Sequence, residues 1–129
     1  MILGTGTDLI DVRRIERALA RYGHRFAQRV LVDDEYRRFC AHGKPAHFLA
    51  KRFAAKEAFS KAMGTGMRFP VTWHNLSVGN EDSGRPYLNV SEPLAALLAQ
   101  RGISRMHLSL SDEIEMACAF VILEGEQHV

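Results

Sequence analysis

The strongest helical signal in the chain is the stretch AHFLAKRFAAKEAFSKAM, residues 46–63. Alanine and long unbranched side chains are frequent in it, and these lose little conformational freedom in a helix. Gly64 follows at the position where a left-handed residue commonly ends a helix. We therefore predict a long helix over residues 46–63, with the rest of the chain packed around it.

The segments before this helix carry the signals of shorter elements. In chain order they predict a strand at residues 2–10, a helix at 12–22 capped by Asp11, a short apolar link at 30–32, and a helix from Asp33 or Asp34 to about Ala41. Gly4 and Gly6 soften the first strand and leave room for another backbone or a ligand to approach it closely.

The segments after the long helix alternate between strand and helix signals. They predict strands at 74–78 and 86–90 joined by a turn at 81–84, a helix capped by Ser91 and ending near Gly102, and a buried antiparallel hairpin of residues 106–111 and 117–123. A chain of 129 residues is long enough for one core and too short for two. The predicted fold is therefore α+β: one domain, residues 1–129, with an antiparallel sheet packed against a long central helix.

Charge is unevenly distributed along the chain, because residues 1–61 hold 13 of the 17 Lys and Arg residues but only 7 of the 15 Asp and Glu. A basic first half suits an acidic partner, which charge alone does not identify. No apolar run is long enough to span a membrane and no secretory leader opens the chain, so we expect a cytoplasmic protein. Cys40 and Cys118 show neither zinc-ligand spacing nor a disulfide framework, and we expect plain thiols.

Two carboxylates form a candidate metal site. Asp8 lies near the end of the glycine-softened strand, and Glu57 lies in the long helix with Lys61 one turn later on the same face. The motifs around both carboxylates lack His and Cys, and oxygen ligands alone favour a hard cation such as Mg²⁺. Phosphate oxygens and waters would complete the coordination, and Lys61 would stabilise charge on a departing phosphate. The pattern indicates phosphoryl-type transfer.

Each of these residues also has a simpler structural explanation. Glu57 and Lys61 alone fit a helix ion pair worth about 0.3–0.5 kcal/mol, and Asp8 alone fits a turn acid. The turn Gly64-Thr65-Gly66 favours the phosphate hypothesis, because its glycines free backbone N–H groups to turn toward an anion that Lys61 would also reach. A dinucleotide-binding loop is excluded, since Leu9 stands where the third glycine of that motif would be.

Basic side chains lie on the outer faces of two predicted elements, a helix and a strand. Arg14, Arg17 and Arg21 are spaced i, i+3 and i+7 on the helix at 12–22, so they form a stripe roughly opposite its apolar positions. That stripe faces solvent or a partner. His107 alternates with Met106 and Leu108 and lies on the opposite face of its strand, although a single strand histidine is more often structural.

Three ordered motifs resemble those of the holo-[acyl-carrier-protein] synthases, the short type of 4′-phosphopantetheinyl transferase. They are GTGTD at residues 4–8 with RIE at 14–16, FLAKRFAAKEA at 48–58, and KAMGTG at 61–66. GRP at 84–86 and HLSLS at 107–111 continue the resemblance, which covers nearly the whole chain in order. The sequence departs from part of the family at Asp112, where several members have a second histidine.

The resemblance implies a fold, a reaction and an assembly. It implies the 4′-phosphopantetheinyl transferase fold and Mg²⁺-dependent transfer of 4′-phosphopantetheine from coenzyme A to a serine of apo-acyl carrier protein. This reaction supports fatty acid synthesis and releases adenosine 3′,5′-bisphosphate. The resemblance also implies a homotrimer with active sites between neighbouring subunits, and neither a nucleic acid nor a membrane as partner.

The family's functional residues carry over onto the positions that match its motifs. The catalytic residues expected are Asp8, Glu57 and Lys61, with Asp8 and Glu57 as metal ligands; the residues expected to bind coenzyme A are Lys61, Gly64, Thr65, Gly66, Arg52 and His107; and those expected to bind the acidic carrier protein are Arg14, Arg17 and Arg21. His107 and Arg52 are expected to act across a subunit boundary.

The sequence leaves open which group acts as the general base and which class of function the chain performs. The serine proton could pass to a metal-bound water, to Glu57, or to a carboxylate such as Glu35. The same carboxylates would also suit a magnesium-dependent phosphate or nucleotide hydrolase that needs no protein acceptor. A third possibility is a binding module whose arginine stripe docks an acidic protein, with Asp8 and Glu57 purely structural.

Overall fold

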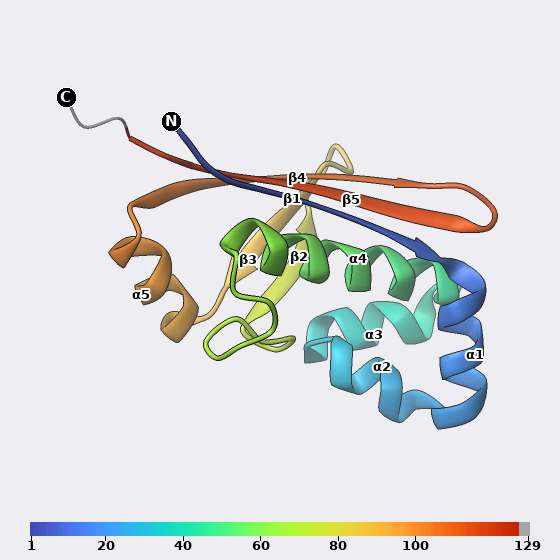
Figure 1. The fold of residues 1–129 in the computed structure, drawn as a ribbon. Coiled ribbons are helices and arrows are strands. Elements are labelled where there is room, and N and C mark those ends of the chain that lie inside the picture. The colour runs from blue at the N-terminus through green and yellow to red at the C-terminus, as the bar shows by residue number, and fades with distance from the viewer. Residues whose placement is uncertain (127–129) are drawn as a thin grey trace.

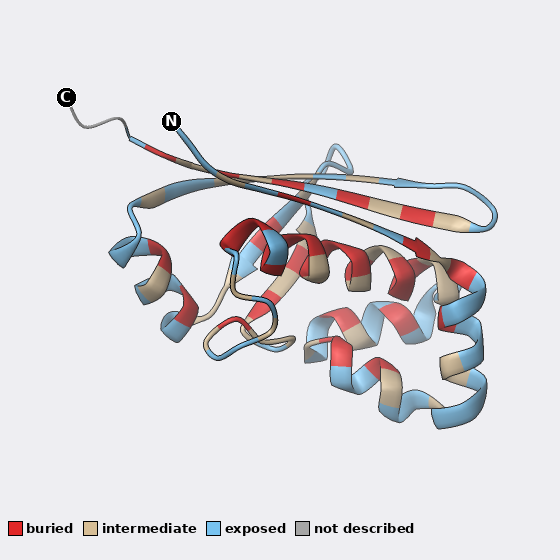
Figure 2. Cartoon of the chain, viewed as in Figure 1, coloured by how far each residue is buried: buried red, intermediate tan, exposed pale blue. Residues whose placement is uncertain are grey.

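Helix α4 (Pro45–Met63) runs through the middle of the computed structural model, which describes residues 1–126 (Figure 1). It confirms the long helix, with Pro45 in its first turn and Gly64 ending it in a left-handed conformation (φ 73°). Most of its side chains are buried (Figure 2), so α4 is a core helix. The other elements are β1 (Ile2–Asp11), α1 (Val12–Tyr22), α2 (His24–Val30), α3 (Asp33–Ala41), β2 (Leu76–Asn80), β3 (Pro86–Val90), α5 (Glu92–Gln100), β4 (Ile103–Asp112) and β5 (Met116–Gly125).

An antiparallel sheet with the strand order β1-β5-β4 covers one side of α4, and a separate hairpin pairs β2 with β3. The inner face of the sheet is lined by small and branched side chains of β5, which are all buried: Ala117, Ala119, Val121 and Leu123. The predicted C-terminal hairpin is confirmed, and both of its strands are longer than the sequence pattern indicates. The arrangement is the α+β fold that the sequence predicts; the single domain stays a prediction, and residues 127–129 lie outside the described part.

Glycines in β1 set the distance between the sheet and α4. A Cβ built on Gly6 would lie 1.9 Å from the carbonyl oxygen of Ala58, and one on Gly4 would lie 2.1 Å from that of Ala62. Neither distance leaves room for a side chain, so only glycine permits this contact. Because side chains alternate along a strand, Asp8 shares the face of β1 that Gly4 and Gly6 turn toward α4.

The outer face of the same sheet carries exposed apolar side chains. Leu9 is 65% exposed and Phe120 is 43% exposed, and the antiparallel register places Cys118 opposite Leu9 and Ile122 on the same face. Figure 1 shows the helices of residues 1–126 on the other side of the sheet. One face of the sheet therefore belongs to the core, and the other is open.

Two local expectations are wrong. Helix α2 has no counterpart in the sequence prediction, because it is seven residues long and buries only Ala27 and Val30, too few positions to show a helical period. The N-cap of α3 is Val32, whose N–H donates to Oε1 of Glu35 at 3.0 Å, so neither Asp33 nor Asp34 caps this helix. Along residues 1–126, no helix has both the length and the apolar character that crossing a membrane requires.

Candidate active site

Asp8 and Glu57 meet where β1 crosses α4. Asp8 lies on the inner face of β1, and its side chain is 15% exposed. Glu57 precedes Ala58, whose carbonyl oxygen lies against Gly6 of β1. The carboxylates are near enough to interact, since burial and then the negative charge of Asp8 raise the pKa of Glu57. The structure thus brings together the two acids that the sequence predicts as a pair.

The donor set at this contact fits a magnesium ion. It offers carboxylate oxygens, and a cation between two like charges relieves their repulsion. Residues 1–126 contain no group of three or more His, Cys, Asp and Glu side chains placed to hold a metal. Mg²⁺ is commonly held by one or two carboxylates, with waters and substrate phosphates completing its shell, whereas structural zinc sites need four protein ligands. Asp8 and Glu57 match the predicted ion, which itself stays a prediction.

Lys61 links α4 directly to β1. Its Nζ donates to Oδ1 of Asp8 at 3.1 Å and to the carbonyl oxygen of Thr7 at 3.0 Å. Within residues 1–126 its ion pair is therefore with Asp8, not with Glu57 on its own helix, so the simple helix pair does not explain this lysine. The Lys61 side chain is 53% exposed, which leaves the ammonium accessible to a bound phosphate.

The turn Gly64-Thr65-Gly66 differs from the expected phosphate cradle. The N–H groups of its three residues donate to the carbonyl oxygens of Lys61 and Ser60 at 3.0–3.3 Å. These amides close the C-terminal end of α4, so the expectation that they point freely toward an anion is wrong. The turn also borders a cavity of about 490 Å³ that Arg68 and Arg101 line, and these guanidiniums supply the positive charge there.

Arg52 is buried between α4 and the β2–β3 hairpin. It is 4% exposed, and its Nη2 donates to the carbonyl oxygen of Val78 at 3.4 Å and to Oδ1 of Asn80 at 3.3 Å. Its Nε has no hydrogen-bond partner among the described residues. Arg52, Arg38 and Lys51 line a cavity of about 470 Å³, so the surroundings suit an anion. Contact of Arg52 with a nucleotide phosphate stays a prediction, now tied to this cavity.

His107 lies on the outer face of β4, as its alternation predicts. Its Nε2 is 3.0 Å from Oε1 of Glu124, and this contact lowers the pKa of Glu124. His107 lines a cavity of about 280 Å³ together with Arg85 and Arg105. The strand register places Asp8 on the inner face of the sheet and His107 on the outer face. Within one chain, therefore, the two do not share a site.

The three arginines predicted on one stripe of α1 are all exposed. Arg14 belongs to the neighbourhood of the carboxylates, because its charge partly offsets the raised pKa of Glu57 that burial and Asp8 cause. Its Cζ is 5.8 Å from the ring centroid of Phe53 on α4. Arg17 lies on the same helix, and the guanidinium of Arg21 is 5.2 Å from the ring centroid of Tyr22.

Two further arginines extend this surface onto α2, where the sequence predicts no helix. Arg25 and Arg29 follow Arg21 at intervals of four residues, and all three line a cavity of about 560 Å³ with Tyr22 and Phe26. The spacing of Arg25 and Arg29 at i, i+4 within one helix is a sequence signal that could have revealed them.

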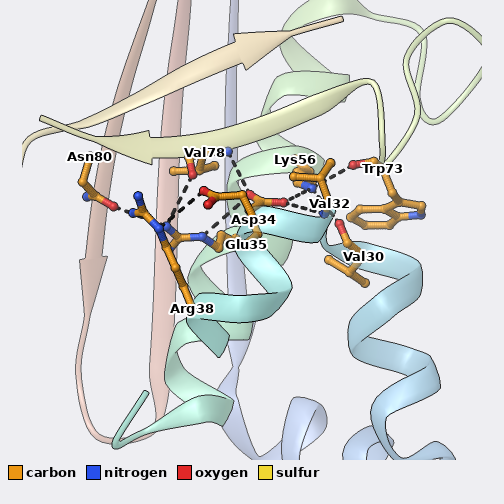
Figure 3. A network of polar contacts seen from close by, with 10 residues as sticks. Val30, Val32, Asp34, Glu35, Arg38, Lys56, Trp73, Val78 and Asn80 are labelled. Carbon is orange, nitrogen blue, oxygen red and sulfur yellow. Dashed lines mark hydrogen bonds and ion pairs between the residues drawn. The ribbon is translucent and has the colours of Figure 1, made fainter. Parts of the chain in front are cut away.

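Glu35 is enclosed in the core and is excluded as the general base. It is 1% exposed, and its carboxylate accepts hydrogen bonds from the N–H groups of Val32 and Val78 and from Nζ of Lys56 (Figure 3). A carboxylate with these partners cannot reach the hydroxyl of an incoming protein.

Comparisons with known proteins identify relatives along nearly the whole chain. A model of the 4′-phosphopantetheinyl transferase superfamily matches residues 4–119. A holo-[acyl-carrier-protein] synthase of Nitrosomonas europaea is 56% identical over 124 residues, which cover 96% of this chain and 99% of that protein.

Solved structures confirm the fold. The crystal structure of holo-[acyl-carrier-protein] synthase from Neisseria meningitidis has a TM-score of 0.93 and 45% identity, covering 96% of this chain and 99% of that one. The enzyme from Bacillus anthracis, in complex with CoA (3′,5′-ADP), has a TM-score of 0.82 and 37% identity, covering 98% and 99%. The chain therefore belongs to the 4′-phosphopantetheinyl transferase superfamily, within its holo-[acyl-carrier-protein] synthase family.

Proposed function

We propose that the chain transfers the 4′-phosphopantetheine group of coenzyme A to a serine of an apo-acyl carrier protein. The observation that carries this proposal is the contact of β1 with α4, which brings Asp8 to the ammonium of Lys61 and near enough to Glu57 to raise the pKa of Glu57. Two carboxylates and a cation are the groups that magnesium-dependent chemistry on a diphosphate requires. The names of the relatives support the choice of substrates. The reaction would serve fatty acid synthesis in the cytoplasm.

In the proposed mechanism, Asp8 and Glu57 would hold Mg²⁺, and the bound ion would supply positive charge that offsets the charge of the coenzyme A diphosphate. Lys61 donates to the diphosphate as well as to Asp8, since an ammonium has three donors. The serine oxygen forms a bond to the phosphorus that carries pantetheine, and the bond from that phosphorus to the bridging oxygen breaks. Adenosine 3′,5′-bisphosphate leaves, and Lys61 balances the negative charge that develops on it. Glu57 and a water remain as candidates to accept the serine proton.

We propose that a neighbouring subunit completes each active site in a homotrimer. Asp8 and His107 occupy opposite faces of one sheet, so a coenzyme A that contacts both must lie between two chains. The open face carries Leu9 and Phe120, whose exposed apolar surface a second copy would bury. His107 and the cavity of Arg52 would then be contributed by the neighbour and contact the nucleotide end of coenzyme A.

The carrier protein would dock on the arginine-rich surface of α1 and α2. Arg14, Arg17 and Arg21 are exposed on α1, and Arg25 and Arg29 continue the positive charge on α2. A strongly acidic partner would be attracted and oriented by such a surface. The charge of Arg14 acts on Glu57, so a partner bound at Arg14 would present its serine near the carboxylate site.

Intact-mass spectrometry tests the proposal directly. The chain is incubated with apo-acyl carrier protein, coenzyme A and Mg²⁺, and we expect the carrier to gain the mass of one phosphopantetheine. Asp8→Ala and Glu57→Ala are each expected to abolish the gain while circular dichroism shows an unchanged fold. Cleavage of coenzyme A without a carrier would instead support a hydrolase. Carrier binding that persists without Mg²⁺ and without the Glu57 carboxylate, and with no mass gain, would support a binding module.

A further inference from the structure

Lys56, the residue before Glu57, has its ammonium enclosed in the core. The side chain is 0% exposed, and Nζ donates to the carbonyl oxygens of Val30 at 2.6 Å and Trp73 at 2.7 Å and to Oε1 of Glu35 at 2.8 Å (Figure 3). These three bonds use all the donors of an ammonium. The acceptors belong to the end of α2, the loop before β2, and α3, so one atom ties three segments to α4.

Stability alone does not account for a lysine at this position. Removing an ammonium from water is costly, and a buried ion pair often contributes no more stability than apolar side chains of similar volume. The cluster moreover holds two cations, Lys56 and Arg52, against the single carboxylate of Glu35. Unlike an apolar side chain, the lysine can fix the orientation of α4, because its three short hydrogen bonds reach acceptors in three different segments.

We infer that Lys56 is a positioning residue that fixes the roll of α4 and thereby aims Glu57 at Asp8, an inference that rests on the proposed role of Glu57 as a metal ligand. The glycine contact at Gly4 and Gly6 sets how far α4 lies from β1, and Lys61 ties the helix to β1 from an exposed position. Neither contact holds the buried side of α4 that faces α2, α3 and the loop before β2. Lys56 resists rotation of the helix about its axis, because any roll of α4 stretches its bonds to three separate segments.

The geometry of a helix makes Glu57 sensitive to this rotation. A carboxylate on the side of a helix lies about 6 Å from the axis, so a roll of about 10° moves it by about 1 Å. Displacements of that size can lower a reaction rate about 100-fold. Residues that orient a metal ligand typically contribute about 10- to 100-fold to metal affinity.

Binding of Mn²⁺ alone, followed by electron paramagnetic resonance, tests the inference without coenzyme A or carrier protein. The variant Lys56→Met keeps an unbranched side chain one heavy atom shorter than that of lysine, leaves Glu35 its contact with Arg52, and removes all three bonds. We expect it to remain folded by circular dichroism at low temperature and to bind Mn²⁺ about 10-fold or more weakly than the unaltered chain. In the transfer assay, kcat falls while the KM for the carrier protein is retained.

The matched control is Lys51→Met, which removes a half-buried lysine from the same helix and breaks only its 3.6 Å pair with Asp112. Because Lys51 lines the cavity of Arg52, this variant is a control for metal affinity and folding, not for transfer. The Mn²⁺ affinity of Lys51→Met should equal that of the unaltered chain. A folded Lys56→Met with unchanged Mn²⁺ affinity overturns the inference, since it shows that the lysine is only structural.

A second variant decides the matter if Lys56→Met does not fold. Lys56→Arg keeps the charge opposite Glu35, but a planar guanidinium cannot donate from one nitrogen to three acceptors. We expect a folded protein with weakened Mn²⁺ binding, and unchanged binding would overturn the inference. Failure of the proposed function is a separate result, because it is read from the mass of the carrier protein, whereas loss of Mn²⁺ affinity is read on the chain alone. No Mn²⁺ binding by the unaltered chain would overturn the inference as well.

Discussion

Gly6 lacks a side chain because the carbonyl oxygen of Ala58 occupies the space where a Cβ would stand. We expect Gly6→Ala to push α4 away from β1, to lower the free energy of unfolding by about 1–3 kcal/mol or more, and to abolish transfer. Urea unfolding followed by the fluorescence of Trp73 measures the loss. Gly43→Ala is the control, since a Cβ on Gly43 meets nothing within 4 Å and should change stability by less than about 0.5 kcal/mol. Equal urea midpoints for Gly6→Ala and Gly43→Ala would contradict the close contact between Gly6 and the carbonyl oxygen of Ala58.

Glu57 is expected to titrate above its ordinary value of 4.5 in the metal-free protein, because burial and the charge of Asp8 both disfavour its ionised form. A pKa that is raised on folding means that the contribution of this group to stability is present at low pH and is lost as the pH rises through the folded pKa. Carbon-13 NMR of the carboxyl group measures the pKa. Asp8→Asn should lower it, though not to the ordinary value, since burial is the larger cause. A midpoint at or below 4.5 in the unaltered chain would refute this picture.

Arg14 is expected to matter for the carrier protein more than for coenzyme A. Arg14→Ala should raise the KM for the carrier by about 10-fold and weaken the dependence of the rate on salt, because it removes one charge from the docking surface. The KM for coenzyme A should stay the same. Arg37→Ala removes another exposed guanidinium, from α3, where it pairs with Asp34, and should leave both constants unchanged. Equal carrier KM values for the two variants would remove Arg14 from the docking surface.

In the buried cluster between α3 and α4, we expect the loss of stability caused by a substitution to depend on the charge that it removes, not on the change in side-chain size. Glu35→Gln keeps the volume but leaves two buried cations, Lys56 and Arg52, with no anion, and should lower the free energy of unfolding by about 3–5 kcal/mol. Lys56→Met should cost less, because Glu35 then faces Arg52 alone. Urea unfolding of both variants at one pH gives the order. A larger loss for Lys56→Met would mean that the hydrogen bonds to Val30 and Trp73 outweigh the charge balance.

The same helix shows how far sequence reasoning reaches. Asp8 and Glu57 could be paired in advance, because glycines mark a close approach on one strand and Glu57 lies in a motif shared with a known family. The role of Lys56 could not be foreseen, since Lys51, Lys56 and Lys61 all lie on α4 and no spacing tells which is buried. That depends on the ends of α2 and α3, which are distant in sequence. The prediction that the turn after Met63 turns its N–H groups toward an anion is wrong for a related reason: these groups donate to carbonyl oxygens of the preceding helix.

Strand β5 carries apolar side chains on both of its faces. Ala117, Ala119 and Val121 fill the core beneath the sheet, yet the alternate positions Cys118, Phe120 and Ile122 are apolar too. A strand that is apolar on both faces is typical of a sheet covered on both sides. Residues 1–126 cover the face toward α4 and leave the other face open (Figure 2), so the sequence of β5 favours assembly of several copies through the open face.

A charged side chain on that open face should therefore dissociate the proposed trimer and abolish transfer. We expect the unaltered chain to elute in size-exclusion chromatography with light scattering at three times its mass of 14.5 kDa, and Phe120→Asp to elute as a folded single chain. The variant should lose transfer because it can no longer combine Asp8 of one chain with His107 of another. Ile114→Asp is the control, since Ile114 is 85% exposed in the β4–β5 turn, and it should remain trimeric and active. A single-chain Phe120→Asp with full activity would show that Asp8 and His107 need not meet between subunits.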